Sequence, residues 1–305
     1  MRIALGTIPL GSAVSQRDSF AILDRFVDAG GTLLDTANNY PFWVEGCTGD
    51  ESEATIGAWL AARGSAVRDR VFVGTKVGAR PVVPGDRTLD NTEGLSAAAI
   101  NAGIEGSLRR LRTDRVDLYW AHVEDRSVPL EETLGAFHGL VSAGKVRELG
   151  ASNLPTWRLE RARARAATPY THVQLRHTYL RPRPGVALPE GGHTLASEEL
   201  LGYVREEPDL TLWAYNTLMF GAYTRADRPI QEIFDHPGTT ARLAVLREVA
   251  GELGVTVNQV VLAWLLADNV VPIVGVSTMD QLEEAIGAAD VKLDASVLAR
   301  LDAPA

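Results

Sequence analysis

Short apolar runs alternate with amphipathic stretches from one end of the chain to the other. Eight of these runs, each four to seven residues long, have the length and composition of buried strands. They predict strands at 3–7, 32–35, 71–76, 116–122, 146–152, 171–176, 210–215 and 270–275. Elsewhere apolar residues recur at helical spacing, as Phe20, Leu23, Phe26 and Val27 do. This spacing predicts helices at 18–29, 51–63, 96–111, 130–143, 154–166, 195–205, 240–252, 256–267 and 279–288.

The alternation of strands and helices predicts the fold class. Strands that are separated by helices run parallel, and eight such units close naturally into a (β/α)8 TIM barrel. An open doubly wound sheet is the alternative, but it requires a particular glycine-rich turn after its first strand. The glycines of "GTIPLG" (6–11) do not have that spacing. We therefore expect one α/β domain over residues 1–305.

Charge and composition narrow the class of protein. The net charge of −9 argues against a nucleic-acid or acidic-membrane binder, because such proteins present a basic face. The single cysteine, Cys47, allows no intramolecular disulfide and suits a reducing compartment. We see no secretion signal and no apolar run long enough to span a bilayer. These features favour a cytoplasmic protein, either a monomer or a homo-oligomer.

Reactive side chains follow three neighbouring strands. Asp35 ends the second predicted strand and Tyr40 comes five residues later; Lys76 ends the third strand and His122 the fourth. The carboxyl ends of barrel strands form one face, where active sites collect. Taken singly, each residue is more often structural, for example a capping aspartate or a satisfied histidine. Four of them at corresponding positions favour a site.

The chemistry of this set suits carbonyl reduction. An ammonium close to a phenol lowers its pKa, so we expect Lys76 to make Tyr40 a better acid. Asp35 would keep Lys76 charged, and His122 would orient a substrate oxygen. A tuned proton donor is what reduction by hydride transfer requires. A Schiff-base isomerase or lyase using Lys76 is disfavoured, because the adjacent carboxylate would keep the amine protonated.

Several motifs resemble those of the aldo-keto reductase family. "DTANNY" (35–40), "VGTKVG" (73–78) and "VDLYWAHVED" (116–125) are similar to its aspartate–tyrosine, lysine and histidine segments. The resemblance continues through "GKVRELGASN" (144–153), "AYNTLMFG" (214–221) and the segment 257–288, and so covers nearly the whole chain. It implies that Tyr40 is the general acid and that Lys76, Asp35 and His122 complete a catalytic tetrad. It also implies a nicotinamide dinucleotide bound across the barrel mouth, without a Rossmann domain.

The same resemblance implies a set of cofactor contacts. Ser152, Asn153 and Gln174 would hold the nicotinamide carboxamide, and Tyr215 would stack on the ring. By themselves, Ser152 and Asn153 could equally cap the helix that follows. The remaining expected contacts, from the last two strand-end loops, are Asn216, Leu218, Gly221, Gly275, Ser277, Thr278, Gln281 and Glu284, the last of them beside the adenine.

The chain departs from the family pattern in three places. Members that prefer NADP carry a cation near residues 277–281, and here those positions have none. A phosphate without a cation is weakly held, so the choice between NADP and NAD stays open. Lys292, Arg225 or Arg228 could compensate. The family's N-terminal β-hairpin is missing or reduced, and strand 171–176 leads into "RHTYLRPRPG" instead of a Glu-Tyr-Asn sequence.

The predicted substrate pocket is aromatic. We expect Phe42, Trp43, Trp120 and His177 to line it, together with loops 177–194 and 217–238, although Trp120 has even odds of being core. Such walls suit a flat ring or the apolar face of a sugar. Cys47 and the arginines of 158–167 carry no predicted role, and no metal-binding motif is present.

The sequence thus predicts an enzyme with a small-molecule carbonyl or alcohol substrate. We expect NAD(P)H-dependent, reversible reduction of an aldehyde or ketone, with a keto-sugar or an aromatic carbonyl among the candidates. The alternative is a redox-sensing subunit that binds the cofactor with little turnover.

Overall fold

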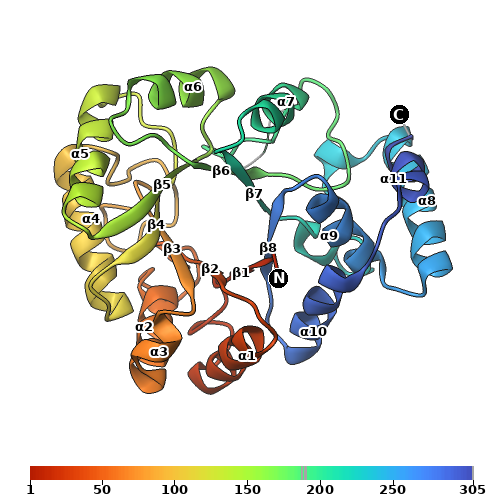
Figure 1. The fold of residues 1–305 in the computed structure, drawn as a ribbon, viewed down its shortest axis with the longest axis horizontal. Coiled ribbons are helices and arrows are strands. Elements are labelled where there is room, and N and C mark those ends of the chain that lie inside the picture. The colour runs from red at the N-terminus through yellow and green to blue at the C-terminus, as the bar shows by residue number, and fades with distance from the viewer. Residues whose placement is uncertain (187, 189–190, 304–305) are drawn as a thin grey trace.

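The computed structural model describes residues 1–186, 188 and 191–303, which form a closed barrel of eight parallel strands (Figure 1). Each strand pairs with the next along the chain, and the last pairs with the first. The strands are β1 Ala4–Gly6, β2 Leu33–Asp35, β3 Phe72–Val77, β4 Val116–Ala121, β5 Val146–Ser152, β6 His172–Arg176, β7 Thr211–Tyr215 and β8 Val271–Gly275. The predicted TIM barrel is confirmed.

Helices surround the barrel (Figure 1). They are α1 Gln16–Asp28, α2 Glu51–Arg63, α3 Ser65–Arg68, α4 Ala97–Leu111, α5 Leu130–Ser142, α6 Thr156–Arg165, α7 Glu198–Glu206, α8 Pro237–Leu253, α9 Val257–Ala267, α10 Met279–Gly287 and α11 Ala295–Asp302. The described residues also form three 3-10 turns: η1 Met219–Gly221, η2 Glu232–Phe234 and η3 Ala288–Asp290. The sequence analysis did not predict α3, α11 or these turns. It also placed the start of α8 too late, because Pro237 occupies the first turn of the helix, where its missing N–H costs nothing.

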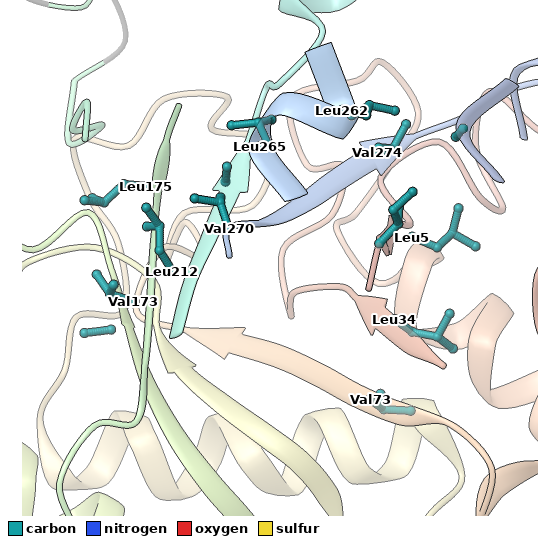
Figure 2. Packing of buried hydrophobic residues seen from close by; sticks show 14 of the residues in the cluster. Leu5, Leu34, Val73, Val173, Leu175, Leu212, Leu262, Leu265, Val270 and Val274 are labelled. Atoms are coloured by element: carbon teal, nitrogen blue, oxygen red, sulfur yellow. The ribbon is translucent and has the colours of Figure 1, made fainter. Parts of the chain in front are cut away.

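Apolar side chains fill both sides of the barrel wall. The larger cluster lies between strands and helices, and Figure 2 shows Leu34, Val73, Val173 and Leu212 within it. A smaller cluster occupies the barrel interior: Ala4, Leu118, Trp120, Trp213, Val271 and Ile273. Because successive residues of a strand face opposite sides, one strand supplies both clusters. The interior is therefore packed, as in other TIM barrels, and is not a channel.

Strand register places two of the reactive side chains on the same side of the barrel wall. Asp35 pairs with Gly74, and Lys76 lies two residues beyond Gly74 on β3. Residues two apart on a strand share a face. Lys76 is therefore one step nearer the rim than Asp35, on the same inner side.

Two outer helices approach closely behind this pair. A Cβ on Gly57 of α2 would lie 1.9 Å from the backbone oxygen of Arg110 in α4, so only glycine fits there. Arg110 Nε donates to Glu53 Oε2 at 2.6 Å. Glu53 is fully buried and also accepts from Thr75 Oγ1 at 2.5 Å. This buried bridge connects the helix contact to the residue before Lys76.

By length and composition, no single helix among the described residues could cross a membrane; α8 and α9 qualify only together, with a 98° bend between them. Within the same part of the chain, no group of three or more His, Cys, Asp or Glu side chains could hold a metal ion.

Candidate active site

Asp35 and Lys76 form a buried ion pair at the end of β2 and β3. Lys76 Nζ lies 2.6 Å from Asp35 Oδ2, and the two residues are 0% and 3% exposed. The ammonium also donates to the Thr36 carbonyl at 2.7 Å, and Gln174 Nε2 donates to Asp35 Oδ1 at 2.9 Å. Burial lowers the pKa of Lys76, while the negative charge of Asp35 opposes that shift. Asp35 therefore acts to keep the amine protonated.

Tyr40 reaches back over this pair from the loop after β2. Its hydroxyl lies 3.5 Å from His122 Nε2, and Lys76 Nζ lies over its ring, 4.8 Å from the centroid. Burial raises the pKa of Tyr40 well above its ordinary value, and Asp35 and Tyr215 add to the shift. The expectation that Lys76 makes Tyr40 a better acid is therefore not met: burial outweighs any effect of the ammonium, and the pKa is raised. The ammonium donates to Asp35 and Thr36 and faces the ring of the phenol.

His122 completes the group as a neutral imidazole. Burial lowers its pKa well below 6.5, and the positive charge of Lys76 and the proximity of His193 lower it further. Its Nε2 faces the Tyr40 hydroxyl, whereas its Nδ1 is buried without a hydrogen-bond partner among the described residues. A neutral imidazole beside a neutral phenol can bind an uncharged oxygen such as that of a carbonyl.

The loop that carries Tyr40 is anchored at several points. Asn38 Nδ2 donates to Glu93 Oε1, and Asn39 Nδ2 to the Ala79 carbonyl, both at 2.8 Å. Next in the chain are two aromatic residues of the predicted pocket. Phe42 is buried, whereas Trp43 is 41% exposed and meets the edge of the Tyr40 ring at 5.8 Å between centroids.

The residues predicted to hold the carboxamide lie beside the ion pair and His122. Asn153 Nδ2 donates to the His122 carbonyl at 3.1 Å and to Ser152 Oγ at 3.0 Å. Asn153 Oδ1 accepts from the Tyr215 hydroxyl at 2.8 Å and from Thr194 N at 3.1 Å. An amide has two donor hydrogens and two acceptor positions, so the protein itself uses all four. A ligand on Asn153 would have to share one of these bonds.

The loops after β7 and β8 hold the other predicted cofactor contacts. Asn216 has φ +54° and a buried Nδ2 without a hydrogen-bond partner in the part of the chain that is described. Leu218 packs on the outer apolar core, and Gly221 has φ +92°, which favours glycine. At the end of β8, a Cβ on Gly275 would meet nothing nearer than the Gly6 carbonyl at 3.9 Å. A free amide donor and an open stretch of backbone fit an extended dinucleotide.

The helix α10 begins shortly after β8, and three of the predicted cofactor contacts lie at its start. Thr278 caps the helix by accepting from Gln281 N, and Gln281 Oε1 accepts from Ser277 N at 2.7 Å. Glu284, one turn later, accepts from Asn258 Nδ2 at 3.1 Å. The capped helix presents N–H groups at its first turn, which suit an anionic group.

The three candidate cations for a 2′-phosphate differ in their surroundings. Arg225 makes two hydrogen bonds to Asp227, at 2.6 and 3.0 Å, and Arg228 lies 4.0 Å from the same carboxylate. Lys292 is exposed, in the segment between η3 and α11. The structure thus gives Arg225 an acidic partner that a phosphate would have to displace.

Two of the predicted pocket residues are placed elsewhere. Trp120 is fully buried in the barrel interior, where its ring meets Trp213 edge to face at 5.6 Å, so it is core. His177 packs against Trp264 of α9, 5.8 Å between ring centroids, and burial lowers its pKa to about 4. It therefore lies on the helix side of the wall and does not face the mouth.

The mouth has a different histidine, His193, which the sequence analysis did not single out. Its Nδ1 lies 2.9 Å from the Tyr215 hydroxyl. The residue belongs to loop 177–194, which was expected to form a pocket wall and of which residues 187 and 189–190 lie outside the described residues. No local pattern in the sequence marks this position, because only the path of the loop brings it to the site.

Comparisons with known proteins identify the family. The model of the Aldo/keto reductase family matches residues 2–304. The uncharacterized oxidoreductase YrpG of Bacillus subtilis is 34% identical over 99% of this chain and 91% of its own length. The norsolorinic acid reductase of Emericella nidulans is 32% identical over 95% of this chain and 74% of its own. An aryl-alcohol dehydrogenase of Pestalotiopsis microspora is 28% identical over 96% and 76%, respectively.

A solved structure is similar as well. The crystal structure of a thermostable aldo-keto reductase in complex with the inhibitor epalrestat superposes with a TM-score of 0.77 and 26% identity. The match covers 100% of this chain and 95% of that one. The fold, the family model and the relatives agree, and the chain belongs to the aldo/keto reductase family.

Proposed function

We propose that this protein reversibly reduces an aldehyde or ketone to the alcohol with NADH or NADPH, and that Tyr40 donates the proton. The observation that carries this proposal is the buried group at the barrel mouth. A neutral phenol and a neutral imidazole lie 3.5 Å apart beside the Asp35–Lys76 ion pair. Relatives named as oxidoreductases support the reaction class.

Each side chain has a distinct task in this proposal. A bound nicotinamide dinucleotide would supply the hydride. The Tyr40 hydroxyl and His122 Nε2 hold the carbonyl oxygen between them. As the carbonyl carbon is reduced, this oxygen becomes an alkoxide, a far stronger base than a phenolate, so Tyr40 donates its proton despite its raised pKa. Lys76 then stabilises the phenolate, and Asp35 keeps Lys76 charged.

Aromatic carbonyl compounds are the substrate class that we propose first. Trp43 stands partly exposed over the edge of Tyr40, with Phe42 beside it at 5.2 Å between ring centroids. Flat aromatic side chains at this position favour a flat ring in the substrate. The name of one relative, an aryl-alcohol dehydrogenase, agrees with this class. A keto-sugar, bound by its apolar face, is the second candidate.

A fluorescence titration with NADH and NADPH, each separately, tests the cofactor proposal. The absence of a cation at residues 277–281 favours comparable affinity for the two nucleotides. Binding of NADPH at least tenfold tighter than NADH would show that a cation from elsewhere, such as Lys292 or Arg225, reaches the phosphate.

The substitution Tyr40→Phe tests the proton donor. We expect the turnover of an aromatic aldehyde to fall by about 100-fold or more, as for the loss of a general acid, with nucleotide affinity nearly unchanged. Tyr203→Phe is the matched control, because the Tyr203 hydroxyl on α7 donates to Glu160 of α6 at the protein surface, away from the barrel mouth. Full activity in Tyr40→Phe would refute the proposed donor. A wild type that binds nucleotide tightly but reduces none of a broad panel of carbonyls would favour the redox-sensing alternative.

A further inference from the structure

His193 begins a chain of hydrogen bonds that ends at the backbone of His122. Its Nδ1 lies 2.9 Å from the Tyr215 hydroxyl, and the two rings meet edge to face, 5.6 Å between centroids. The Tyr215 hydroxyl donates to Asn153 Oδ1 at 2.8 Å, and Asn153 Nδ2 donates to the His122 carbonyl at 3.1 Å. His193 is also close enough to His122 to lower its pKa. It therefore belongs to the same mouth of the barrel.

The direction of this chain follows from counting hydrogens. A tyrosine hydroxyl has one hydrogen, and that of Tyr215 goes to Asn153 Oδ1. The Tyr215 oxygen must therefore accept from His193, so His193 Nδ1 carries a hydrogen. The next residue, Thr194, donates its backbone N–H to the same Asn153 oxygen at 3.1 Å. Two consecutive loop residues thus fix the phenol and the amide together.

We propose that His193 is a positioning residue that orients Tyr215 and Asn153 for the nicotinamide end of the cofactor. This inference rests on the proposed function, in which Tyr215 stacks on the nicotinamide ring and Asn153 bonds its carboxamide. His193 touches neither the cofactor nor the reacting atoms in this account; it acts through the Tyr215 hydroxyl. Without it, the Tyr215 oxygen loses the hydrogen bond that it accepts from His193, and the ring is held less firmly at the angle that its bond to Asn153 requires.

Nucleotide affinity measures this effect directly. The dissociation constant of the nucleotide that the wild type binds better is determined by fluorescence for wild type, His193→Ala and His193→Asn. We expect His193→Ala to bind about fivefold to tenfold more weakly, the usual value of one hydrogen bond. His193→Asn places an amide N–H near the position of Nδ1 and should bind within about twofold of wild type. A structural role for the imidazole would not be rescued in this way.

The chain offers a matched control on its outer surface. His138 on α5 also has its Nδ1 close to a hydroxyl, 2.7 Å from Thr168 Oγ1, and is likewise half-buried. His138→Ala should leave nucleotide affinity unchanged. A loss of affinity in this variant equal to that of His193→Ala would mean that removing any such histidine loosens the protein, and would overturn the inference.

A double-mutant cycle with Tyr215→Phe tests whether His193 acts through the hydroxyl. Phenylalanine keeps the ring but removes the atom that accepts from His193, so His193→Ala should have no further effect in that background. The same loss in both backgrounds, or no loss in the wild-type background, would overturn the proposal. If the wild type binds neither NADH nor NADPH, the proposed function itself fails, which is a different result from an unchanged His193→Ala variant.

Discussion

Replacing Asp35 by asparagine would remove the charge that balances Lys76 while keeping the shape of the site. The ammonium, which has no exposed surface, would then keep the neutral Thr36 carbonyl as a hydrogen-bond partner. The other carboxylate that acts on it, Glu53, is already paired with Arg110. Breaking one side of a buried ion pair costs about 3–5 kcal/mol of folding free energy. Lys76 can limit this cost by losing its proton, because a neutral amine is no longer an unpaired buried charge.

The free energy needed to deprotonate Lys76 sets the largest loss of stability that the substitution can cause, and it depends on pH. Removing the proton from a lysine of pKa 10.5 at pH 8 costs about 3.5 kcal/mol, since it spans about 2.5 pH units at about 1.4 kcal/mol each. In the folded Asp35→Asn variant Lys76 is then neutral, whereas in the unfolded chain it is protonated. The unfolded state binds more protons, so the stability of the variant rises with pH. We expect a penalty of about 3.5 kcal/mol at pH 8 and about 2 kcal/mol at pH 9.

Urea unfolding followed by tryptophan fluorescence measures this penalty, with wild type and variant compared at each pH. The six tryptophans provide the signal. Glu283→Gln is the control, because its partner Arg25 and Glu283 itself are 39% and 45% exposed. Such a surface pair should contribute less than about 1 kcal/mol, without a trend over this pH range. A penalty for Asp35→Asn that stays constant from pH 7.5 to 9 would refute the argument that Lys76 gives up its proton.

Three further predictions concern packing, alkaline stability and turnover. Gly57→Ala should lower the free energy of unfolding in urea by about 2–3 kcal/mol, because the new Cβ would lie 1.9 Å from the Arg110 carbonyl. Gly139→Ala is the control: it has open space around it and should raise the free energy of unfolding by up to about 1 kcal/mol. Burial raises the pKa of Tyr170, so above pH 10 the unfolded chain loses the Tyr170 proton before the folded protein does, and the free energy of unfolding falls as the pH rises. In urea unfolding at several pH values, Tyr170→Phe should reduce that fall by about 1.4 kcal/mol per pH unit. Lys76→Met should lower turnover at least about 100-fold with nucleotide binding retained, and a rate near that of wild type would exclude Lys76 from the proposed mechanism.

The strand positions and the barrel could be predicted because they depend on local patterns of apolar and polar residues, which can be read from the sequence without a structure. Each strand is a short apolar run between helical periods, and the strand ends fix where Asp35 and Lys76 lie. The helix α11 was not predicted, although Asp294 is a good N-cap and accepts from two backbone N–H groups. At eight residues it is too short for a strong periodic signal.

Side-chain direction could have been predicted further than it was. His177 follows Val173 and Leu175 at two-residue spacing, and both of these pack in the cluster outside the barrel. The alternation of a strand therefore assigns His177 to the outer side. Trp120 does face the inside of the barrel, as a pocket residue would. Its ring lies against Gly150 of the neighbouring strand, where a Cβ would come within 2.3 Å, so the missing side chain makes room for the ring in the core.

Other features depend on the folded chain alone. The raised pKa of Tyr40 results from the depth of its burial, and nothing in "DTANNY" states that depth. His193 reaches Tyr215 only because the loop after β6 returns to the mouth, where Thr194 bonds Asn153. Loop paths of this kind are set by tertiary contacts between distant residues, which a local pattern does not contain.

The burial of Lys76 has a practical consequence for chemical modification. The sequence contains three lysines, and Lys76 has no exposed surface. Acylating reagents and amine-reactive resins would therefore meet Lys292, which is exposed, and Lys145, which forms a partly exposed ion pair with Glu105. Dyes or solid supports can thus be attached through lysine while the amine in the barrel keeps its chemistry.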